Sequence, residues 1–322
     1  QCTAQCVRMM MALLNLVLVG LILGLAAWAI LAREAFAASI GFLVFGILLT
    51  LAWVQLSAID VALTEATISG GLTSLLLMYA ATRLRASKVP DNHVNPSKAV
   101  RYIAGCLSAS VSLALVVCVF ALPESRPSLA PEVALNIAAT GVSNPITAVL
   151  LAFRAMDTLL EAIVLMFALI GVWSLAPDEC WGGRPGLIRQ SAPEGILVLV
   201  ARILPPFGII IGAYIFWIGA DLPGGKFQGA AIIAGSWLLA MIAGLVDAPA
   251  IGRSCLRFAL VFGPLSYIAM GFIGPLTSGD FFGYPEGLAK PLMAAVELAL
   301  MPSLTLVIVM LLLGSPRHGA QW

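Results

Sequence analysis

Charged residues are scarce in this chain: only 10% of its 322 residues are Asp, Glu, Lys or Arg, whereas 61% are hydrophobic. The mean hydropathy is +1.03. Soluble globular domains carry about 25% charged residues, so this composition excludes a soluble domain and indicates an integral membrane protein. The net charge is only +1, and no basic patch is interleaved with aromatic residues, which excludes a nucleic-acid partner.

Residues that usually perform catalysis or hold cofactors are also few. The two histidines, His93 and His318, lie in or near expected loops, and no nucleophile can be paired with a base. The six cysteines are scattered; only Cys2 and Cys6 are close together, without a second pair or a histidine beside them. The sequence therefore predicts that the chain is not an enzyme and binds no cofactor or metal.

Apolar runs of about 20 residues, the length that crosses a bilayer, recur along the chain. They predict an all-α, polytopic transmembrane protein with spans near residues 9–32, 36–56, 58–80, 99–122, 157–176, 196–219, 228–247, 254–275 and 290–314. Two polar or Pro/Gly-rich breaks, 82–98 and 177–193, divide these spans into groups of three, two and four. A short helix is expected at 132–139, before the fifth span.

The distribution of basic residues predicts the orientation in the membrane. The connection from Arg83 to Arg101 is the most basic one, so the positive-inside rule places it in the cytoplasm. The expected orientation in the cell membrane is then an outside N-terminus and a cytoplasmic C-terminus. Most of the remaining Lys and Arg residues also fall on the cytoplasmic side in this arrangement.

An acidic cluster opens the fifth span. Asp157 and Glu161 are four residues apart, so they stand one turn apart on one helix face, and Arg154 on the preceding turn can reach Asp157. An acidic side chain near mid-span costs about 2.5–3.5 kcal/mol on insertion scales, which favours an ion path with a partner nearby. The alternative is a salt bridge that anchors the helix end near the interface, where the cost falls.

Three further acids lie in apolar helices. Asp60 and Glu65 are five residues apart in the third span, about 140° from facing one another, so each needs its own partner. Glu297 lies close to Pro302 in the last span. It is either an ion site or a group hydrogen-bonded to a neighbouring helix or to backbone freed by the proline.

Three stretches resemble known membrane modules. Residues 56–65, Leu-Ser-Ala-Ile-Asp-Val-Ala-Leu-Thr-Glu, resemble the acidic helix of the D-type module of membrane-bound hydrogenases and of the C-terminal end of the Mrp antiporter A subunit. Residues 153–161, Phe-Arg-Ala-Met-Asp-Thr-Leu-Leu-Glu, resemble the E-type signature Asp-Phe-Arg-Gly-Phe-Asp-Thr-Leu-Gly-Glu. Residues 223–229, Pro-Gly-Gly-Lys-Phe-Gln-Gly, are similar to the Pro-Gly-Gly-Gly-Phe-Gln-Gly turn of the Mrp B subunit. The order D, E, B gives modules 9–82, 99–177 and 194–314.

The resemblance implies a membrane subunit of a multi-subunit Mrp-type antiporter that exchanges Na⁺ for H⁺ together with other membrane subunits. It assigns to the ion pathway Asp157, Glu161, Arg154, Thr158 and Asp60, whereas Glu65 and Glu297 are candidates on position alone. The chain departs from the family pattern at Ala152, which replaces an Asp, and at Ala155, Leu160 and Lys226, which replace glycines. Lys226 would add an outer positive charge that could repel an entering cation.

Two alternative functions remain open at this point. The same modules occur in redox-driven complexes of the hydrogenase or complex-I-like kind, whose redox centres lie on other subunits. A scaffold function would rest on small-residue helix packing at Gly208, Gly212, Gly219, Gly229, Gly235 and Gly244. For the transport function, we expect Asp60, Asp157 and Glu161 to face one pocket in the outer half of the bilayer, with a neighbouring subunit completing the cytoplasmic half.

Overall fold

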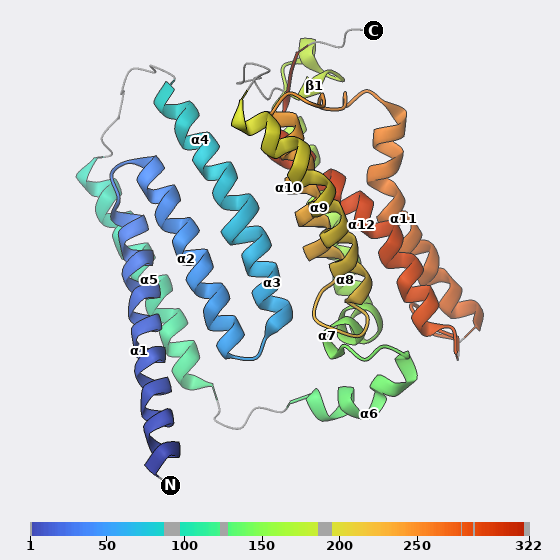
Figure 1. The fold of residues 1–322 in the computed structure, drawn as a ribbon, viewed down its shortest axis with the longest axis horizontal. Coiled ribbons are helices and arrows are strands. Elements are labelled where there is room, and N and C mark those ends of the chain that lie inside the picture. The colour runs from blue at the N-terminus through green and yellow to red at the C-terminus, as the bar shows by residue number, and fades with distance from the viewer. Residues whose placement is uncertain are drawn as a thin grey trace.

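The computed structural model shows a body of long helices with a single two-stranded ribbon at one end (Figure 1). The structure describes residues 2–86, 97–122, 128–185, 195–277, 279–285 and 287–318. Helices α1 (Cys2–Leu31) and α2 (Ala35–Gln55) form the first hairpin. Helix α3 (Ile59–Thr67) then continues through the π-helical segment η1 (Ile68–Thr73) into α4 (Ser74–Ala86).

The middle of the chain contains two long helices and a bent connection. These elements are α5 (Lys98–Ala121), α6 (Ala130–Thr140), α7 (Pro145–Ala148), the π-helical segment η2 (Val149–Phe153) and α8 (Ala155–Trp173). The short helix α6 corresponds to the one expected at 132–139. The axis turns by 87° between α6 and the segment formed by α7 and η2. A 3₁₀ turn, η3 (Asp178–Cys180), follows α8.

Four helices and the ribbon complete the fold. The helices are α9 (Ile196–Ile218), α10 (Lys226–Ile242), α11 (Ser254–Thr277) and α12 (Ala289–Leu313). Strand β1 (Arg184–Pro185) pairs antiparallel with β2 (Pro316–His318). Residues 87–96 of the basic break and residues 186–193 of the second break lie outside the described residues.

The all-α, multi-pass prediction is confirmed. Among the described residues, eight helices are long and apolar enough to cross a membrane, and the bent segment from α6 to η2 would bring the number to nine. The span expected at 228–247 differs: α10 has only 17 residues and ends at Ile242. Its early end has a local cause, because Gly244 adopts a φ of 74°, which reverses the chain there.

Glycines bring α9 and α10 into close contact. A Cβ on Gly229 would lie 2.6 Å from the carbonyl oxygen of Gly212, so this crossing tolerates no side chain. In the same interface, a Cβ on Gly208 would clash with the hydroxyl oxygen of Ser236. A Cβ on Gly235, by contrast, would meet only the Leu72 side chain, at 3.9 Å. Most of the glycines expected at the scaffold are therefore true packing positions, and Gly235 is not.

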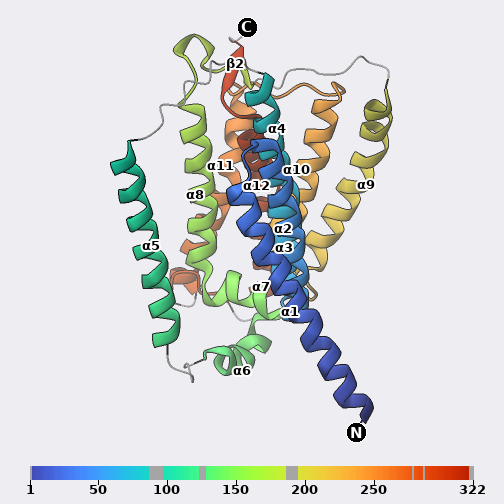
Figure 2. The same cartoon turned by 90° about the vertical axis from the view of Figure 1, so that its left-hand side faces the viewer.

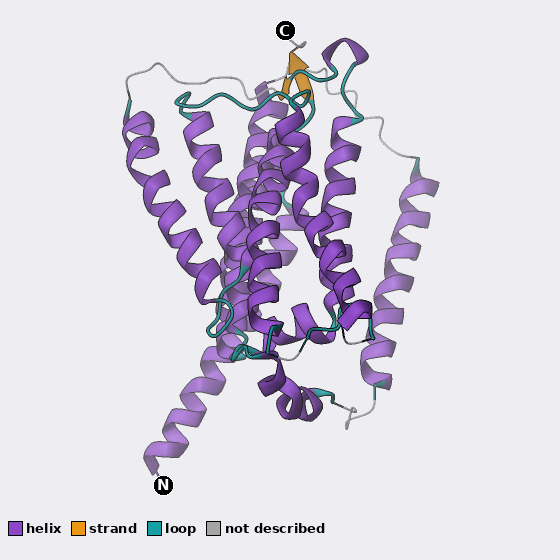
Figure 3. Cartoon of the chain, turned by 90° about the vertical axis from the view of Figure 1, so that its right-hand side faces the viewer, coloured by secondary structure: helices purple, strands orange, loops and turns teal. Residues whose placement is uncertain are grey.

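Burial divides the helices into a core and a periphery. Helix α12 is the most buried span, and its residues contribute to both apolar clusters of the core. Helices α1 and α5 bury none of their most apolar residues. In Figure 2, α5 stands apart from the other helices, and Figure 3 shows α1 projecting past the body at its N-terminal end. Such apolar surfaces fit contact with lipid or with neighbouring membrane proteins.

Candidate functional site

The acidic cluster lies at the start of α8. The helix begins at Ala155, one residue after the π-helical segment η2 and Arg154, so Asp157 falls in its first turn. A carboxylate there is stabilised by the helix dipole. Arg154 Nη2 lies 2.5 Å from Asp157 Oδ2, with both side chains at least half exposed. Glu161 stands one turn further along α8, on the face of Asp157, as the spacing predicts.

Thr158 contacts the backbone of the connection before α8. Its side chain is 2% exposed, and its hydroxyl donates to the Leu150 carbonyl at 2.7 Å. Leu150 belongs to the π-helical segment η2, whose irregular winding leaves carbonyls available to side-chain donors. Thr158 thus fastens α8 to η2, and it is not among the residues that line the cavity described next.

A cavity of about 630 Å³ collects the acidic groups of all three parts of the chain. Its charged and amide-bearing lining residues are Asp60, Asp157, Glu161, Lys226, Gln228 and Glu297. We call this space the acidic cavity. Glu65 does not line it; it is half-buried further along α3. The three carboxylates expected to face one pocket therefore share this space, and Glu297 and Lys226 join them.

Asp60 ties the beginning of α3 to the glycine turn before α10. Its Oδ1 accepts hydrogen bonds from the Gly224 amide at 3.0 Å and from Asn144 Nδ2 at 3.3 Å. The Asn144 amide also donates to the carbonyls of Gly219 at 3.2 Å and Leu222 at 3.0 Å. Glycine-turn amides are good anion-binding groups, and the anion bound here is the chain's own Asp60 carboxylate.

Gln228 adds a second link between α3 and α10. Its Nε2 donates to Thr64 Oγ1 at 2.8 Å and to the Asp60 carbonyl at 3.2 Å. The sequence did not single out Gln228 or Asn144 individually, although Gln228 lies within the turn that resembles the Mrp B subunit. These contacts fix the position of the Asp60 side of the cavity.

Lys226 and Glu297 form a buried ion pair, which the sequence reasoning missed. Lys226 is 4% exposed and Glu297 7% exposed, and Lys226 Nζ lies 3.6 Å from Glu297 Oε1. Lys226, expected as an outer positive charge, is thus buried and paired with Glu297, and it lines the acidic cavity; its effect on an entering cation stays a prediction. Glu297 pairs with a neighbouring helix, which agrees with one of its two open interpretations. The available signal was two lone residues of opposite charge in apolar surroundings.

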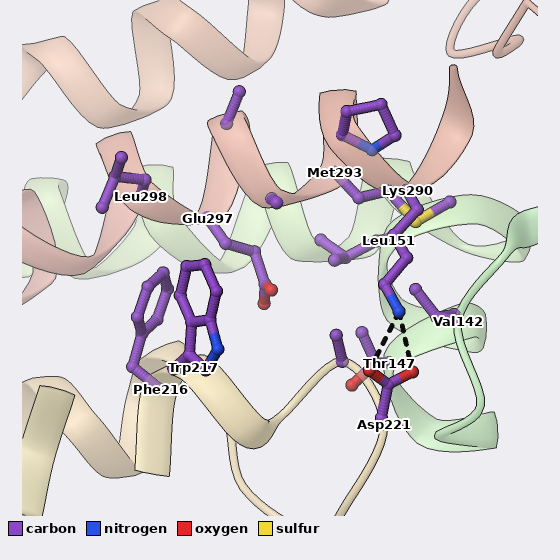
Figure 4. A pocket seen from close by; sticks show the side chains of 14 residues that line it. Val142, Thr147, Leu151, Phe216, Trp217, Asp221, Lys290, Met293, Glu297 and Leu298 are labelled. Carbon is purple, nitrogen blue, oxygen red and sulfur yellow. Dashed lines mark hydrogen bonds and ion pairs between the residues drawn. The ribbon is translucent and has the colours of Figure 1, made fainter. Parts of the chain in front are cut away.

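Glu297 also lines a second cavity, of about 540 Å³. Figure 4 shows the Glu297 carboxylate pointing into this space between Trp217 and the Lys290–Asp221 ion pair, in which Lys290 Nζ lies 2.9 Å from both carboxylate oxygens. The hydrogen bond from Lys290 lowers the pKa of the Asp221 carboxyl, and the Ser143 amide adds to this effect. We call this space the rim cavity, because Asp221 and Lys290 are about half exposed.

Tyr284 lies close to both cavities without lining either. Burial, and to a lesser extent the negative charge of Glu297, raise the pKa of its hydroxyl, which therefore stays protonated. The hydroxyl donates to the Leu151 carbonyl at 2.9 Å, another carbonyl of the η2 segment. Two side chains, Thr158 and Tyr284, thus stabilise the irregular backbone beside the site.

Comparison with known families identifies two parts of the chain. Residues 20–86 match the MbhD family, the D-type subunit of MBH, and residues 196–315 match the domain related to the MnhB subunit of Na⁺/H⁺ antiporter. The chain thus contains an MbhD domain and an MnhB-related domain, which confirms the resemblance of these two parts. Neither match covers 99–177, so the E-type module there stays a prediction.

Curated relatives match over a limited length. A protein named antiporter subunit mnhA2 from Staphylococcus saprophyticus is 31% identical over 133 residues, which are 41% of this chain and 16% of that protein. The protein of the same name from Staphylococcus aureus strain MRSA252 is 32% identical over 136 residues, again 41% of this chain and 16% of the relative. The match therefore spans about one sixth of each relative.

Two solved complexes contain chains of similar fold. A chain in the structure of the Mrp complex from Dietzia sp. DQ12-45-1b matches with a TM-score of 0.70 and 22% identity, covering 95% of this chain and 35% of that one. A chain of the membrane-bound sulfane sulfur reductase, an archaeal respiratory membrane complex, matches with a TM-score of 0.50 and 24% identity, covering 66% and 97%. The fold and the two domains define a multi-pass membrane protein built like the membrane subunits of Mrp-type antiporters and related membrane complexes.

Proposed function

We propose that this chain is a membrane subunit of an Mrp-type cation/proton antiporter complex and that its acidic cavity forms part of the route for Na⁺ or H⁺. The observation that carries the proposal is the convergence of Asp60, Asp157 and Glu161, from two separate parts of the chain, on one cavity. Acidic groups within membrane spans are costly and mark ion or proton paths by default. The mnhA2 relatives are antiporter subunits by name, which supports the same function.

The geometry suggests how a cation could be handled in this cavity. Asp157 and Glu161 present carboxylates one helical turn apart, about 6 Å along the axis at 1.5 Å per residue. Each carboxylate can bind either a proton or a sodium ion, and competition between the two is the elementary requirement of exchange. Arg154 pairs with Asp157 at the cavity end of α8 and offsets one negative charge. An entering cation would therefore be attracted mainly by the other two carboxylates of the cavity, Asp60 and Glu161.

We further propose that the acidic cavity opens to the outer side of the membrane. The support is the excess of basic residues in the segments at the opposite end of the body, together with the positive-inside rule. Single cysteines introduced at Asp157 or Glu161 should react with a water-soluble maleimide added from outside, and Na⁺ should protect them. Labelling only from the cytoplasmic side would contradict this proposal and would mean that the acidic cavity opens to the cytoplasm.

The decisive experiment measures Na⁺-dependent collapse of a pH gradient in vesicles that contain the whole complex. We expect Asp157→Asn and Glu161→Gln each to reduce exchange strongly, because each removes a carboxylate that binds the ion. Native gel electrophoresis should show normal assembly, since both residues are exposed at the cavity. Asp247→Asn is the matched control: Asp247 is an exposed carboxylate paired with Arg184 away from both cavities, at 3.2 Å. Retained exchange in both cavity variants would contradict the proposal.

A second candidate function is a membrane subunit of a redox-driven ion-pumping complex. It is favoured by the fold shared with a chain of the sulfane sulfur reductase, of which this chain covers 97%. In that case the same carboxylates would carry ions whose movement is driven by electron transfer at redox centres on other subunits. Affinity purification distinguishes the two: co-purifying iron–sulfur or nickel proteins would favour the redox complex, and membrane subunits without redox centres would favour the antiporter.

A purely structural function is the remaining alternative. It is supported by the hydrogen bonds of Asp60 with the glycine turn and by the close α9–α10 contact at Gly212 and Gly229. A scaffold would tolerate charge-neutral substitutions at Asp157 and Glu161 but would disassemble on substitution of these glycines. The vesicle assay and the native gel described above therefore separate a scaffold from a transport subunit.

A further inference from the structure

The Lys226–Glu297 pair joins two charged residues to which the family resemblance assigns no function. Lys226 replaces a glycine of the turn that resembles the Mrp B subunit, and Glu297 is an acid in an otherwise apolar helix. They come from α10 and α12 and meet in the body of the protein, 4% and 7% exposed. Either charge alone would be strongly disfavoured in these surroundings, so the two residues form one unit.

The geometry of the pair is loose. The 3.6 Å between Lys226 Nζ and Glu297 Oε1 exceeds the 2.7–2.9 Å of a strong charge-assisted hydrogen bond. The ammonium group also lies 5.8 Å from the centroid of the Phe227 ring. Buried ion pairs of modest geometry add little stability, and well-packed apolar residues can often replace them. Stability alone therefore gives little reason for this pair.

Glu297 lies at the boundary between the two cavities. It lines both the acidic cavity and the rim cavity, whereas Lys226 lines the acidic cavity alone. Thr147 also lines both, but its hydroxyl already donates to the Gly219 carbonyl at 2.6 Å. Within the described part of the chain, Glu297 is therefore the one titratable residue that borders both cavities.

We propose that Glu297 passes protons between the acidic cavity and the rim cavity, with Lys226 as the charge that holds its ionised form in place. A proton from the acidic cavity adds to the carboxylate, which neutralises Glu297 and releases it from Lys226. The proton then leaves on the rim side, and the carboxylate that forms returns to the ammonium group. No net charge is left behind. This inference rests on the proposed ion-transport function.

The surroundings of Glu297 suit such a transfer. The charged and titratable groups around it are Lys226, with Asp60, Asp157 and Glu161 across the acidic cavity, Asp221 and Lys290 across the rim cavity, and the two tyrosines Tyr267 and Tyr284. The acids of the acidic cavity can supply protons, and the rim cavity, which is bordered by the half-exposed Asp221–Lys290 pair, can release them to water. Lys226 is the positive charge in direct contact with Glu297, so it controls the cost of ionising the acid.

The test is the double variant Lys226→Met/Glu297→Leu in the whole complex. These residues match the originals in size and leave no buried charge, so a structural function of the pair would be preserved. We expect normal assembly on a native gel and exchange reduced to the level of vesicles without the complex. Wild-type exchange in the double variant would overturn the proposal.

A second variant keeps the test decisive if the first does not assemble. Lys226→Gln/Glu297→Gln leaves no buried charge and allows a hydrogen bond between the two amides, but it cannot take up and release a proton. We expect an assembled complex without exchange, and an active Lys226→Gln/Glu297→Gln complex would overturn the proposal. Asp247→Asn is again the matched carboxylate control.

Parallel measurements separate this proposal from the transport function on which it rests. If Asp157→Asn and Glu161→Gln abolish exchange while the Lys226 and Glu297 variants remain active, only the transfer through Glu297 is wrong. If all these variants remain active, the transport function itself fails, and the transfer through Glu297 fails with it.

Discussion

Substitution of Asp60 should separate its structural contribution from any ion-binding contribution. In Asp60→Ala, the amide of Gly224, which is buried, loses the oxygen that accepts its hydrogen bond. Asn144 loses one contact but keeps the carbonyls of Gly219 and Leu222, so its cost is smaller. One buried donor without a partner costs about 1–3 kcal/mol, and we expect Asp60→Ala to destabilise the fold by this amount.

The isosteric variant Asp60→Asn gives the contrast. Its side-chain carbonyl can still accept from Gly224 and Asn144, although a neutral acceptor forms hydrogen bonds about half as strong as a carboxylate does. We therefore expect the free energy of unfolding to fall less in Asp60→Asn than in Asp60→Ala, by less than about half of the loss in the alanine variant. It nevertheless removes the negative charge from the acidic cavity, so exchange should fall while the complex stays assembled.

The assay is thermal denaturation of the purified complex, read out as the fraction of this chain that stays in the native-gel band after heating. Vesicle exchange is measured on the same preparations, with Asp247→Asn as the control for loss of an exposed carboxylate. An Asp60→Ala complex as heat-stable as the wild type would refute the hydrogen-bond reasoning. Full exchange in an Asp60→Asn complex would show that Asp60 contributes only its structural hydrogen bonds and not ion binding.

Two further predictions concern packing and pH. Gly229→Ala should destabilise the α9–α10 contact by about 1–3 kcal/mol, because its Cβ would lie 2.6 Å from the Gly212 carbonyl oxygen; Gly171→Ala, with no atom within 4 Å, is the control in the same thermal assay. The lowered pKa of Asp221 means that its pair with Lys290 stabilises the fold above pH 3.8 and that this contribution is lost as the pH falls through the lower folded-state value. Asp221→Asn should therefore be less heat-stable than the wild type near neutral pH and indistinguishable from it in strong acid, and an equal difference at both pH values would contradict the assignment.

Much of the fold follows from the sequence because one physical constraint dominates it. A span must be apolar over about 20 residues, so each long helix is visible as an uninterrupted run. The spacing of Asp157 and Glu161 predicted a shared helix face, and α8 has that geometry. Helix periodicity relates residues within one element only, and α10 illustrates this limit: its apolar run continues past Ile242, but the positive φ of Gly244 ends the helix.

The sequence predicted only part of the candidate site. The chemistry of Asp60, Asp157 and Glu161 pointed to one cavity, but the pairing of Lys226 with Glu297 depends on how α10 packs against α12. No local pattern encodes which helices become neighbours. Thr158 shows the opposite limit, because the motif pointed to it as an ion-pathway residue. Its hydroxyl instead donates a hydrogen bond to a backbone carbonyl of the π-helical segment, and it does not line the acidic cavity.

The contact between Asp60 and Gly224 also sets an order for biosynthesis. The two residues are separated by 164 positions. At about 5–20 residues per second, the ribosome delivers Gly224 roughly 8–33 seconds after Asp60. Asn144, the other donor to this carboxylate, follows Asp60 by only 84 positions and is therefore made well before Gly224. The contact that ties α3 to the turn before α10 forms last, and a nascent chain halted before that turn leaves Asp60 with Asn144 as its donor.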